Sequence, residues 1–305
     1  EVDQGVVLDM ALTEAEREAG YRLMCMAKPT SEVVEIDYGT VDARPRLFPP
    51  RERVLSVVTE RIPRTPTIVE VRLRPVGEPL RYWPGQYLMV GDERAGAPPR
   101  PYSIANAPRT DGEISLLVTR VPDGATSTWI HDHLEVGVRV TVAGPYGTFI
   151  GDPGTDGPVV CLAAGSGLAP ILALTDAALR RGFRHPVTLV YSARSADDVF
   201  DDGLFAWWTA KHRRFDFRVT YTGDDAPPDA AFRGRIPEVL DEIVRPASAD
   251  DWIARSVYVA GSPGFVDDCV AAVRARGALD DHVFVERYHL QHLHPRGRPR
   301  EETWG

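Results

Sequence analysis

Short runs of alternating apolar and polar residues fill the chain from residue 53 to about residue 150. They include RVLSVVTERI, TIVEVRLRPV, GQYLMV, EISLLVTRV and VRVTVAG, and one helix-like segment, STWIHDHL, interrupts them. A period of two is typical of half-buried strands, and short strands separated by turns are typical of a small antiparallel barrel. The pattern therefore predicts an antiparallel β-barrel domain over residues 51–150.

The rhythm changes after the segment 151–158, which is rich in glycine, proline and aspartate. Strand-like runs such as PVVCLAAG, PVTLVYS, FDFRVTYTG and SVYVAGS then alternate with helix-like runs such as LAPILALTDAALRR and GFVDDCVAAVRARG. This alternation is typical of a parallel sheet with helices on both faces. We expect a doubly wound α/β domain over residues 156–288, followed by a polar tail over residues 289–305.

Residues 1–43 precede a proline-rich linker, ARPRLFPPRER, which suits a domain boundary. Within them, LTEAEREAGYRL predicts a helix in which Thr13 and Glu16 form a capping box. The run EVVEIDYG that follows alternates like a strand. We expect a small separate domain, or part of one, at this end.

Composition narrows the classes of function. Hydrophobic residues make up 43% of the chain and charged residues 26%, as in ordinary globular proteins, and the net charge of −9 argues against a nucleic-acid surface. No apolar run approaches the length of a membrane span. Cys25, Cys161 and Cys269 lie far apart, which argues against a disulfide framework and favours a reducing compartment. We therefore expect no nucleic-acid partner, no membrane and a cytoplasmic location, with Cys161 and Cys269 in the core.

Two glycine turns of the α/β half each join a strand to a helix. In AAGSGLAP (163–170), Gly165 and Gly167 permit a tight turn, and the amides at the start of the following helix can hold a diphosphate. The second turn, in VAGSPGFVDD (259–268), should lie at the same carboxyl edge of the sheet, where ligands bind. A plain strand–helix turn remains the alternative for either alone, but two on one edge favour nucleotide binding.

The barrel half carries two motifs that suit a second nucleotide. RPYS places Arg100, Tyr102 and Ser103 on one extended segment. An arginine suits a phosphate, an aromatic ring suits stacking on a flat heterocycle, and a hydroxyl suits a ring nitrogen. GATS (124–127) enters a short helix whose first amides can hold a diphosphate. Each motif alone is also compatible with an ordinary strand or an N-cap.

Six motifs in this order resemble one family. RPYS, GATS, GPYGTF, AAGSGLAP, YSARSADDVF and VAGSPGFVDD resemble the ferredoxin–NADP⁺ reductase superfamily over residues 53–288. Within it they are most similar to the reductase components of bacterial multicomponent oxygenases. The resemblance implies an enzyme that takes hydride from NADH onto FAD. It then passes single electrons through a 2Fe–2S centre to an oxygenase component or its ferredoxin.

The resemblance also implies roles for individual residues. Tyr102 would pack on the isoalloxazine ring and Ser103 would bond near its N5 atom, so both are catalytic candidates. The residues implied to bind FAD or the coenzyme are Arg100, Pro101, Tyr102, Ser103, Val118, Gly124, Ala125, Thr126, Ser127, Gly165, Ser166, Gly167, Leu168, Ala169, Pro170, Arg194, Gly261, Ser262, Pro263 and Tyr288. Many relatives have a cysteine where Ala260 stands, so no thiol is expected at that point. Glu286 is expected to be a surface carboxylate, with a hydrogen bond at the site as the alternative.

The resemblance also implies a role for Cys25. Plant-type clusters use three cysteines in C-x₄-C-x₂-C and a fourth further on, and GYRLMCMAKPTSEVVEIDYG resembles the stretch around that fourth ligand. Residues 1–43 then resemble the C-terminal part of a β-grasp ferredoxin domain. Because one thiolate cannot hold two irons, we expect no 2Fe–2S cluster in the chain as given and one in a full-length parent. A small buried residue is the alternative for Cys25.

The coenzyme is expected to be NADH, with NADPH as the alternative. In YSARSADD (191–198), Arg194 with a neighbouring serine could hold a 2′-phosphate, whereas Asp197 and Asp198 would repel it. Two other functions stay open. One is a stand-alone reductase of free flavin, ferric chelates or dyes, and the other is a flavin-binding sensor without turnover.

Overall fold

The computed structural model describes residues 2–3, 28–31, 47–152, 155–199, 203–246 and 249–288. The chain divides into two units, Glu1–Arg46 and Leu47–Gly305. In the first unit, the described residues form one antiparallel pair, β1 (Val2–Asp3) with β2 (Lys28–Pro29). The expected capping box at Thr13 and the predicted cluster ligand Cys25 lie outside the described residues, as does the tail 289–305.

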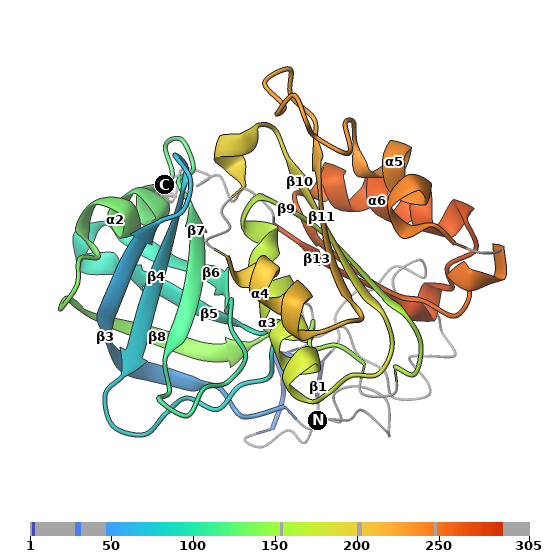
Figure 1. Cartoon of the computed structure of the whole chain (residues 1–305). Coiled ribbons are helices and arrows are strands. Elements are labelled where there is room, and N and C mark those ends of the chain that lie inside the picture. The colour runs from blue at the N-terminus through green and yellow to red at the C-terminus, as the bar shows by residue number, and fades with distance from the viewer. Residues whose placement is uncertain are drawn as a thin grey trace, which may run out of the picture. The chain divides into compact units, whose positions relative to one another are not determined.

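The first half of the second unit is an antiparallel sheet that curls into a barrel (Figure 1). Within the described residues its six strands lie in the order β6 (Ala97–Ser103), β5 (Tyr87–Asp92), β8 (Arg139–Tyr146), β3 (Arg51–Pro63), β4 (Ile68–Pro75) and β7 (Ile114–Thr119). A bridge between Ile104 and Leu116 joins the two ends of the sheet. Alternate apolar side chains such as Val58, Leu73 and Leu88 fill the interior. The predicted antiparallel barrel is confirmed.

One helix, α2 (Ala125–His133), covers an end of this barrel and corresponds to the helix-like segment between the predicted strands. A short 3₁₀ turn, η1 (Glu93–Ala95), links β5 to β6. Ile130 of α2 is buried against the barrel core, so the helix is fixed by the same apolar packing that closes the sheet.

The second half is a parallel sheet between two layers of helices. In the part that the structure describes, five strands lie in the order β11 (Phe215–Tyr221), β10 (Val187–Ala193), β9 (Val159–Ala164), β12 (Ser256–Gly261) and β13 (Val283–Arg287). Helices α3 (Leu168–Arg180) and α4 (Leu204–Lys211) pack on one face, and α5 (Ile236–Val244) and α6 (Pro263–Ala275) on the other (Figure 1). The doubly wound α/β fold is confirmed.

The order of the strands reverses next to β9. From β9 the chain moves outward to β10 and β11, and then returns to the other side of β9 with β12 and β13. In such sheets a crevice opens at the carboxyl ends of the strands where the order reverses, and ligands bind there. The topology therefore directs attention to the turns after β9 and β12.

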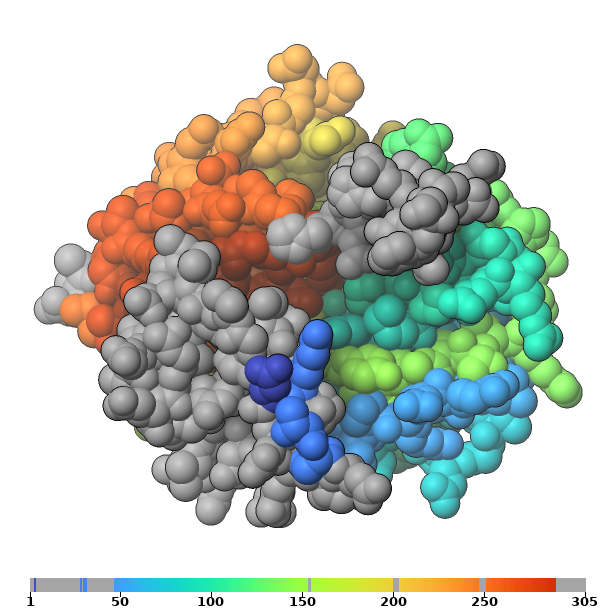
Figure 2. Space-filling model, turned by 180° about the vertical axis from the view of Figure 1, so that it is seen from behind, coloured from blue at the N-terminus to red at the C-terminus, as the bar shows by residue number. Residues whose placement is uncertain are grey.

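Aromatic packing fixes the segment that connects the two halves. The Asp152 amide donates to the Tyr258 hydroxyl of β12 at 3.0 Å. The Tyr258 ring stacks on Phe284, with ring centroids 4.8 Å apart, and meets the edge of Phe149 at 6.0 Å. From behind, the orange and red residues of α5, α6 and β13 form one side of this unit and the blue-to-green barrel strands the other (Figure 2).

Both cysteines of the α/β half are core residues, as predicted. Cys161 on β9 and Cys269 on α6 are buried, and burial raises the pKa of each thiol to about 12. Neither is therefore a reactive thiolate near neutral pH. Within the described part of the chain, none of the helices is both long enough and apolar enough to span a membrane.

Candidate functional site

The first glycine turn forms η2 (Gly165–Gly167), between the end of β9 and the start of α3. Gly165 has a φ of 55°, in the left-handed region that favours glycine. Gly167 approaches β12 so closely that a Cβ there would lie 2.3 Å from the carbonyl oxygen of Ala260. Among the described residues no side chain caps η2 or α3, so no side chain competes with a ligand phosphate for this helix start.

A hydroxyl pair joins this turn to the barrel. Thr119, the last residue of β7, donates from Oγ1 to Ser166 Oγ at 2.8 Å. Because Thr119 is the donor, the proton of Ser166 stays available for another acceptor, such as a phosphate oxygen. None of the sequence motifs included Thr119. Its place at the end of an edge strand was the only signal, and the chain spacing of 47 residues hid the contact.

The second glycine turn lies beside the first. Gly261 ends β12, and β12 and β9 run parallel with Ala260 opposite Ala163. Ser262 then starts α6 with Pro263 in its first turn, and no side chain within the described residues caps this helix. Both turns therefore lie at the same carboxyl edge of the sheet, as the motifs predicted.

The flavin motif of the barrel lies on β6. Arg100 pairs with Val90 and Tyr102 with Leu88, so the pleat places Arg100 and Tyr102 on one face of the strand. Ser103 lies on the opposite face and is only 7% exposed. Tyr102 packs against the barrel core, and this burial raises the pKa of its hydroxyl, so the phenol stays neutral.

The end of β13 reaches this motif from the α/β half. Tyr288, half-buried, donates from its hydroxyl to Ser103 Oγ at 2.9 Å, and its amide donates to the carbonyl of Gly261 at 2.9 Å. Burial raises the pKa of the Tyr288 hydroxyl, so it remains a donor. Tyr288 thus connects the barrel serine with the second glycine turn.

Glu286 lies two residues before Tyr288 and opposite Ala260 on β12. The expectation of a surface carboxylate at a strand end is wrong, because Glu286 is half-buried and burial raises the pKa of its carboxyl. The strand that carries it packs beside β12 and places the group next to Tyr288, whose pKa it also raises. The carboxyl therefore lies close enough to the Tyr288 hydroxyl to influence it.

The hydroxyls of the GATS turn are used within the turn and its surroundings. Ser127 donates from Oγ to the Gly124 carbonyl at 3.1 Å and accepts from the Val121 amide at 3.1 Å. Thr126 donates from Oγ1 to the carbonyl of Pro98 on β6. Both hydroxyls therefore hold the turn in place, and the first backbone amides of α2, beginning with that of Ala125, are left without a partner inside the helix.

Four other predicted site residues are core side chains. The structure buries Val118, Leu168, Ala169 and Pro170. The Val118 carbonyl also lies 2.9 Å from Nε2 of His131. These four residues could meet a ligand through the backbone only. Pro101, in contrast, is exposed on β6.

The loop after β10 carries one basic residue, Arg194, and two acidic residues, Asp197 and Asp198, which differ in exposure. Arg194 and Asp197 are exposed, whereas the Asp198 carboxylate accepts from the Ser195 amide at 3.2 Å and caps η3 (Ala196–Asp198). The Arg194 carbonyl accepts from the Gly223 amide at 2.9 Å, which holds this loop against the one after β11. Asp198 is therefore tied back, and Asp197 is the acid that reaches solvent.

No cluster of three or more histidine, cysteine or acidic residues in the described part of the chain is arranged to hold a metal ion. The predicted ligand Cys25 lies outside that part, so its role stays a prediction.

Comparison with known proteins assigns both halves. The family model of the oxidoreductase FAD-binding domain matches residues 57–150, and that of the oxidoreductase NAD-binding domain matches residues 161–271. The first match covers the barrel and the second most of the α/β half. They confirm the FAD and nicotinamide dinucleotide that the motifs predicted, and identify the chain as an NAD(P)H-dependent oxidoreductase.

Individual relatives agree with these matches. The chain is 34% identical to the reductase subunit of an aromatic O-demethylase from Amycolatopsis sp., over 94% of this chain and 84% of the relative. It is 29% identical to the reductase component of a phenol 2-monooxygenase from Pseudomonas sp., over 95% of this chain and 80% of the relative. The crystal structure of the Amycolatopsis reductase GcoB superposes with a TM-score of 0.77 at 32% identity, over 94% of this chain and 84% of that one. The chain therefore belongs to the ferredoxin–NADP⁺ reductase family, among the reductase components of oxygenase systems.

Proposed function

We propose that this chain takes hydride from NADH onto FAD and delivers the electrons one at a time to an oxygenase component or its ferredoxin. The observation that carries the proposal is the meeting of the two halves at two serines, Ser103 with Tyr288 and Ser166 with Thr119. One serine lies in the flavin motif and the other in the coenzyme turn. FAD supplies the chemistry that side chains lack, since it accepts hydride and releases single electrons.

The barrel residues fit FAD. Arg100 and Tyr102 lie on one face of β6, which suits a cation on the flavin phosphates beside an aromatic ring on the isoalloxazine. The start of α2 has no side-chain cap within the described residues, so its amides can hold the diphosphate. Ser103 accepts from Tyr288 and keeps its own proton for a flavin nitrogen.

The α/β residues fit a nicotinamide dinucleotide. The uncapped start of α3, with the Ser166 proton directed away from Thr119, would hold the diphosphate. The turn Gly261–Pro263 would guide the nicotinamide towards the barrel. Hydride transfer requires reacting atoms about 3–3.5 Å apart, so this positioning is the main contribution of the protein.

Tyr288 and the nicotinamide would compete for the space beside Ser103. In the structure the Tyr288 hydroxyl already bonds Ser103, while its amide bonds Gly261 at the nicotinamide end of the crevice. We therefore propose that the Tyr288 ring covers the flavin when no coenzyme is bound, and that it moves aside when the coenzyme binds.

NADH is the proposed coenzyme because Asp197 is exposed beside Arg194 and would repel a 2′-phosphate. A ratio of kcat/KM that favours NADPH by tenfold would contradict this choice.

The oxygenase partner is inferred from relatives that are named as reductase components of an aromatic O-demethylase and a phenol 2-monooxygenase. The domain bounds 51–150 and 156–288, a cytoplasmic location and the role of Cys25 as a fourth 2Fe–2S ligand in a longer protein belong to the same proposal. Iron–sulfur absorption bands from the present chain would contradict the expected absence of a cluster.

Binding of FAD to the barrel is tested with two matched arginine variants. Arg100→Gln should weaken FAD binding by about 10- to 100-fold, because a charge-assisted hydrogen bond contributes about 1.5–3 kcal/mol. Arg94→Gln, at an exposed turn between the same strands, should leave it unchanged. FAD affinity is measured by quenching of flavin fluorescence, and equal affinities for the two variants would remove Arg100 from the site.

Turnover separates the proposed enzyme from its two alternatives. With NADH and a one-electron protein acceptor, the proposed enzyme reduces the acceptor. A flavin sensor reduces nothing, and a stand-alone reductase reduces dyes or ferric chelates but no iron–sulfur protein.

A further inference from the structure

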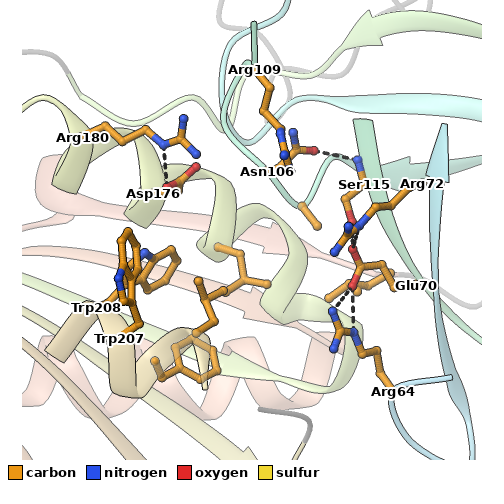
Figure 3. Close-up of a pocket in the computed structure, with 15 residues that line it drawn as sticks. Arg64, Glu70, Arg72, Asn106, Arg109, Ser115, Asp176, Arg180, Trp207 and Trp208 are labelled. Carbon is orange, nitrogen blue, oxygen red and sulfur yellow. Dashed lines mark hydrogen bonds and ion pairs between the residues drawn. The ribbon is translucent and has the colours of Figure 1, made fainter. Parts of the chain in front are cut away.

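A cavity of about 220 Å³ lies between the barrel and the α/β half (Figure 3). Strands β4 and β7 form its barrel side, and helices α3 and α4 form the other side. None of the residues that the motifs assign to FAD or to the coenzyme is part of its lining. The cavity is therefore separate from the proposed reaction site, although it touches both halves.

Positive charge dominates the described lining of this cavity. Four arginines and two acidic residues line it, an excess of two positive charges in a chain whose net charge is −9. The innermost acid, Glu70, is already satisfied by Arg64, Arg72 and the hydroxyl of Ser115. These contacts keep the pKa of Glu70 low although burial acts to raise it, so the carboxylate stays paired. The negative charge of Glu70 is therefore balanced by these arginines and would repel a bound anion only weakly.

Two other arginines face each other across the cavity. Figure 3 shows Arg109 on the barrel side and Arg180 on α3, with a space between their guanidinium groups. Both guanidiniums also lower the pKa of the Tyr82 hydroxyl, against the rise that burial causes. Among the described residues, the ion-pair partners of Arg109 are distant, with Asp111 at 3.4 Å and Glu113 at 4.0 Å.

Arg180 pairs with Asp176 at 2.8 Å, but its side chain is 58% exposed. Because most of the Arg180 side chain faces solvent, its guanidinium has room for a second acceptor, and a carboxylate could share it with Asp176. A carboxylate between Arg109 and Arg180 would receive charge-assisted hydrogen bonds from both halves of the protein.

The opposite side of the cavity is aromatic. Trp208 is buried and held by edge contacts to Phe205 and Phe215, with centroids 5.8 and 5.5 Å apart. Trp207 next to it is 53% exposed, although an indole ring is among the largest apolar surfaces a side chain offers. The Lys211 ammonium lies 4.5 Å from the Trp207 ring and adds another positive charge at this edge. Leu117 and Leu172 complete an apolar floor.

We infer that this cavity binds a small aromatic carboxylate, with its ring against Trp207 and Trp208 and its carboxylate between Arg109 and Arg180. The volume fits this class. A cavity of about 150 Å³ holds benzene, whereas drug-sized ligands occupy about 300–1,000 Å³. One ring with one carboxylate lies between these sizes.

The ligand would bridge the two halves, so its binding should stabilise the folded unit. We expect benzoate, used as the probe, to raise the melting temperature of the FAD-loaded protein with a saturable dependence on concentration. Because the cavity lies apart from the coenzyme turns, benzoate should not compete with NADH. Competition would show that the cavity belongs to the coenzyme site and would overturn the inference.

Isothermal titration calorimetry gives the direct test. Benzoate should bind at one site per chain, and acetate, which lacks the ring, and benzyl alcohol, which lacks the charge, should each bind at least tenfold more weakly. The double variant Arg109→Gln/Arg180→Gln should lose at least tenfold in benzoate affinity, and Trp207→Leu should lose several-fold. Arg94→Gln, an exposed arginine away from the cavity, is the matched control and should bind as the unmodified protein does.

The replaced side chains are exposed, so the variants should fold, and circular dichroism verifies this. Absence of saturable benzoate binding, or equal affinity in the double variant and in Arg94→Gln, would overturn the inference. Neither measurement uses NADH turnover. A failure of the proposed reductase activity would therefore not affect the measured benzoate binding, and an absence of benzoate binding would not affect the proposed reductase activity.

Discussion

Replacing Gly167 by alanine should separate the two strands that form the coenzyme edge of the sheet. A Cβ at this position would lie 2.3 Å from the Ala260 carbonyl oxygen, 2.6 Å from its carbon and 2.8 Å from the Gly261 Cα. All three neighbours are backbone atoms of β12, so no side chain can turn away to make room. The φ of −57° is normal for alanine, so the whole effect comes from this overlap.

The magnitude follows from the overlap. Restoring ordinary contact requires a shift of about 1 Å, and overpacking of this kind costs about 1–3 kcal/mol. For a domain of this size, 1 kcal/mol corresponds to about 2–4 °C, so the melting temperature should fall by about 2–12 °C. Because a misplacement of about 1 Å can cost up to about a hundredfold in rate, kcat/KM for NADH should fall at least about tenfold.

Gly165→Ala in the same turn is the matched control. Among the described atoms nothing lies within 4 Å of a Cβ there, and only the φ of 55° opposes alanine, at about 1–2 kcal/mol. Thermal unfolding by circular dichroism and steady-state NADH oxidation are measured for both variants. The reasoning would be refuted if Gly167→Ala kept the kcat/KM of the unmodified protein, or lost no more of it than Gly165→Ala.

Three further variants test the contacts around the two serines. Tyr288→Phe removes the hydroxyl that donates to Ser103. Urea denaturation should show a loss of about 0.5–1.5 kcal/mol in the free energy of unfolding. An unchanged urea midpoint would contradict the hydrogen bond between Tyr288 and Ser103. Thr119→Val removes the hydroxyl that orients Ser166, with little change in size. KM for NADH should therefore rise up to about fivefold at constant kcat. A fall in kcat alone would refute the positioning role. Burial raises the pKa of Glu286, so its contribution to stability is greatest below the ordinary glutamate pKa and is lost as pH rises through the folded-state pKa. Glu286→Gln should therefore melt progressively higher than the unmodified protein as pH rises from about 4 to about 8, and a difference independent of pH would contradict this assignment.

Local pattern was enough to predict both domain types. Strand β3 alternates with a period of two because one of its faces packs into the barrel, whereas β7 is buried along almost its whole length. The α/β half alternates strands with helices because its sheet is covered on both faces. The two glycine turns could be placed at one edge for the same reason, since parallel strands all end there.

Contacts across the chain could not be predicted in this way. The bond from Tyr288 to Ser103 joins residues 185 positions apart, and nothing in VERYH or RPYS indicates the partner. The burial of Glu286 comes from the packing of β13 beside β12, whereas the residue alone reads as a carboxylate at a strand end. For the GATS turn the motif predicted the helix start, but not that the Thr126 hydroxyl bonds Pro98 and the Ser127 hydroxyl bonds Gly124. The benzoate-sized cavity is lined by residues from separate segments of the chain, so no local sequence motif indicates it.

The central claim is that the barrel and the α/β half bring FAD and NADH together for direct hydride transfer. Anaerobic mixing of the FAD-loaded protein with NADH in a stopped-flow spectrophotometer tests it most directly. The account predicts that the flavin absorbance bleaches within seconds with one equivalent of NADH, and that Ser103→Ala slows the bleaching. Flavin that binds but stays oxidised in the presence of excess NADH would contradict it.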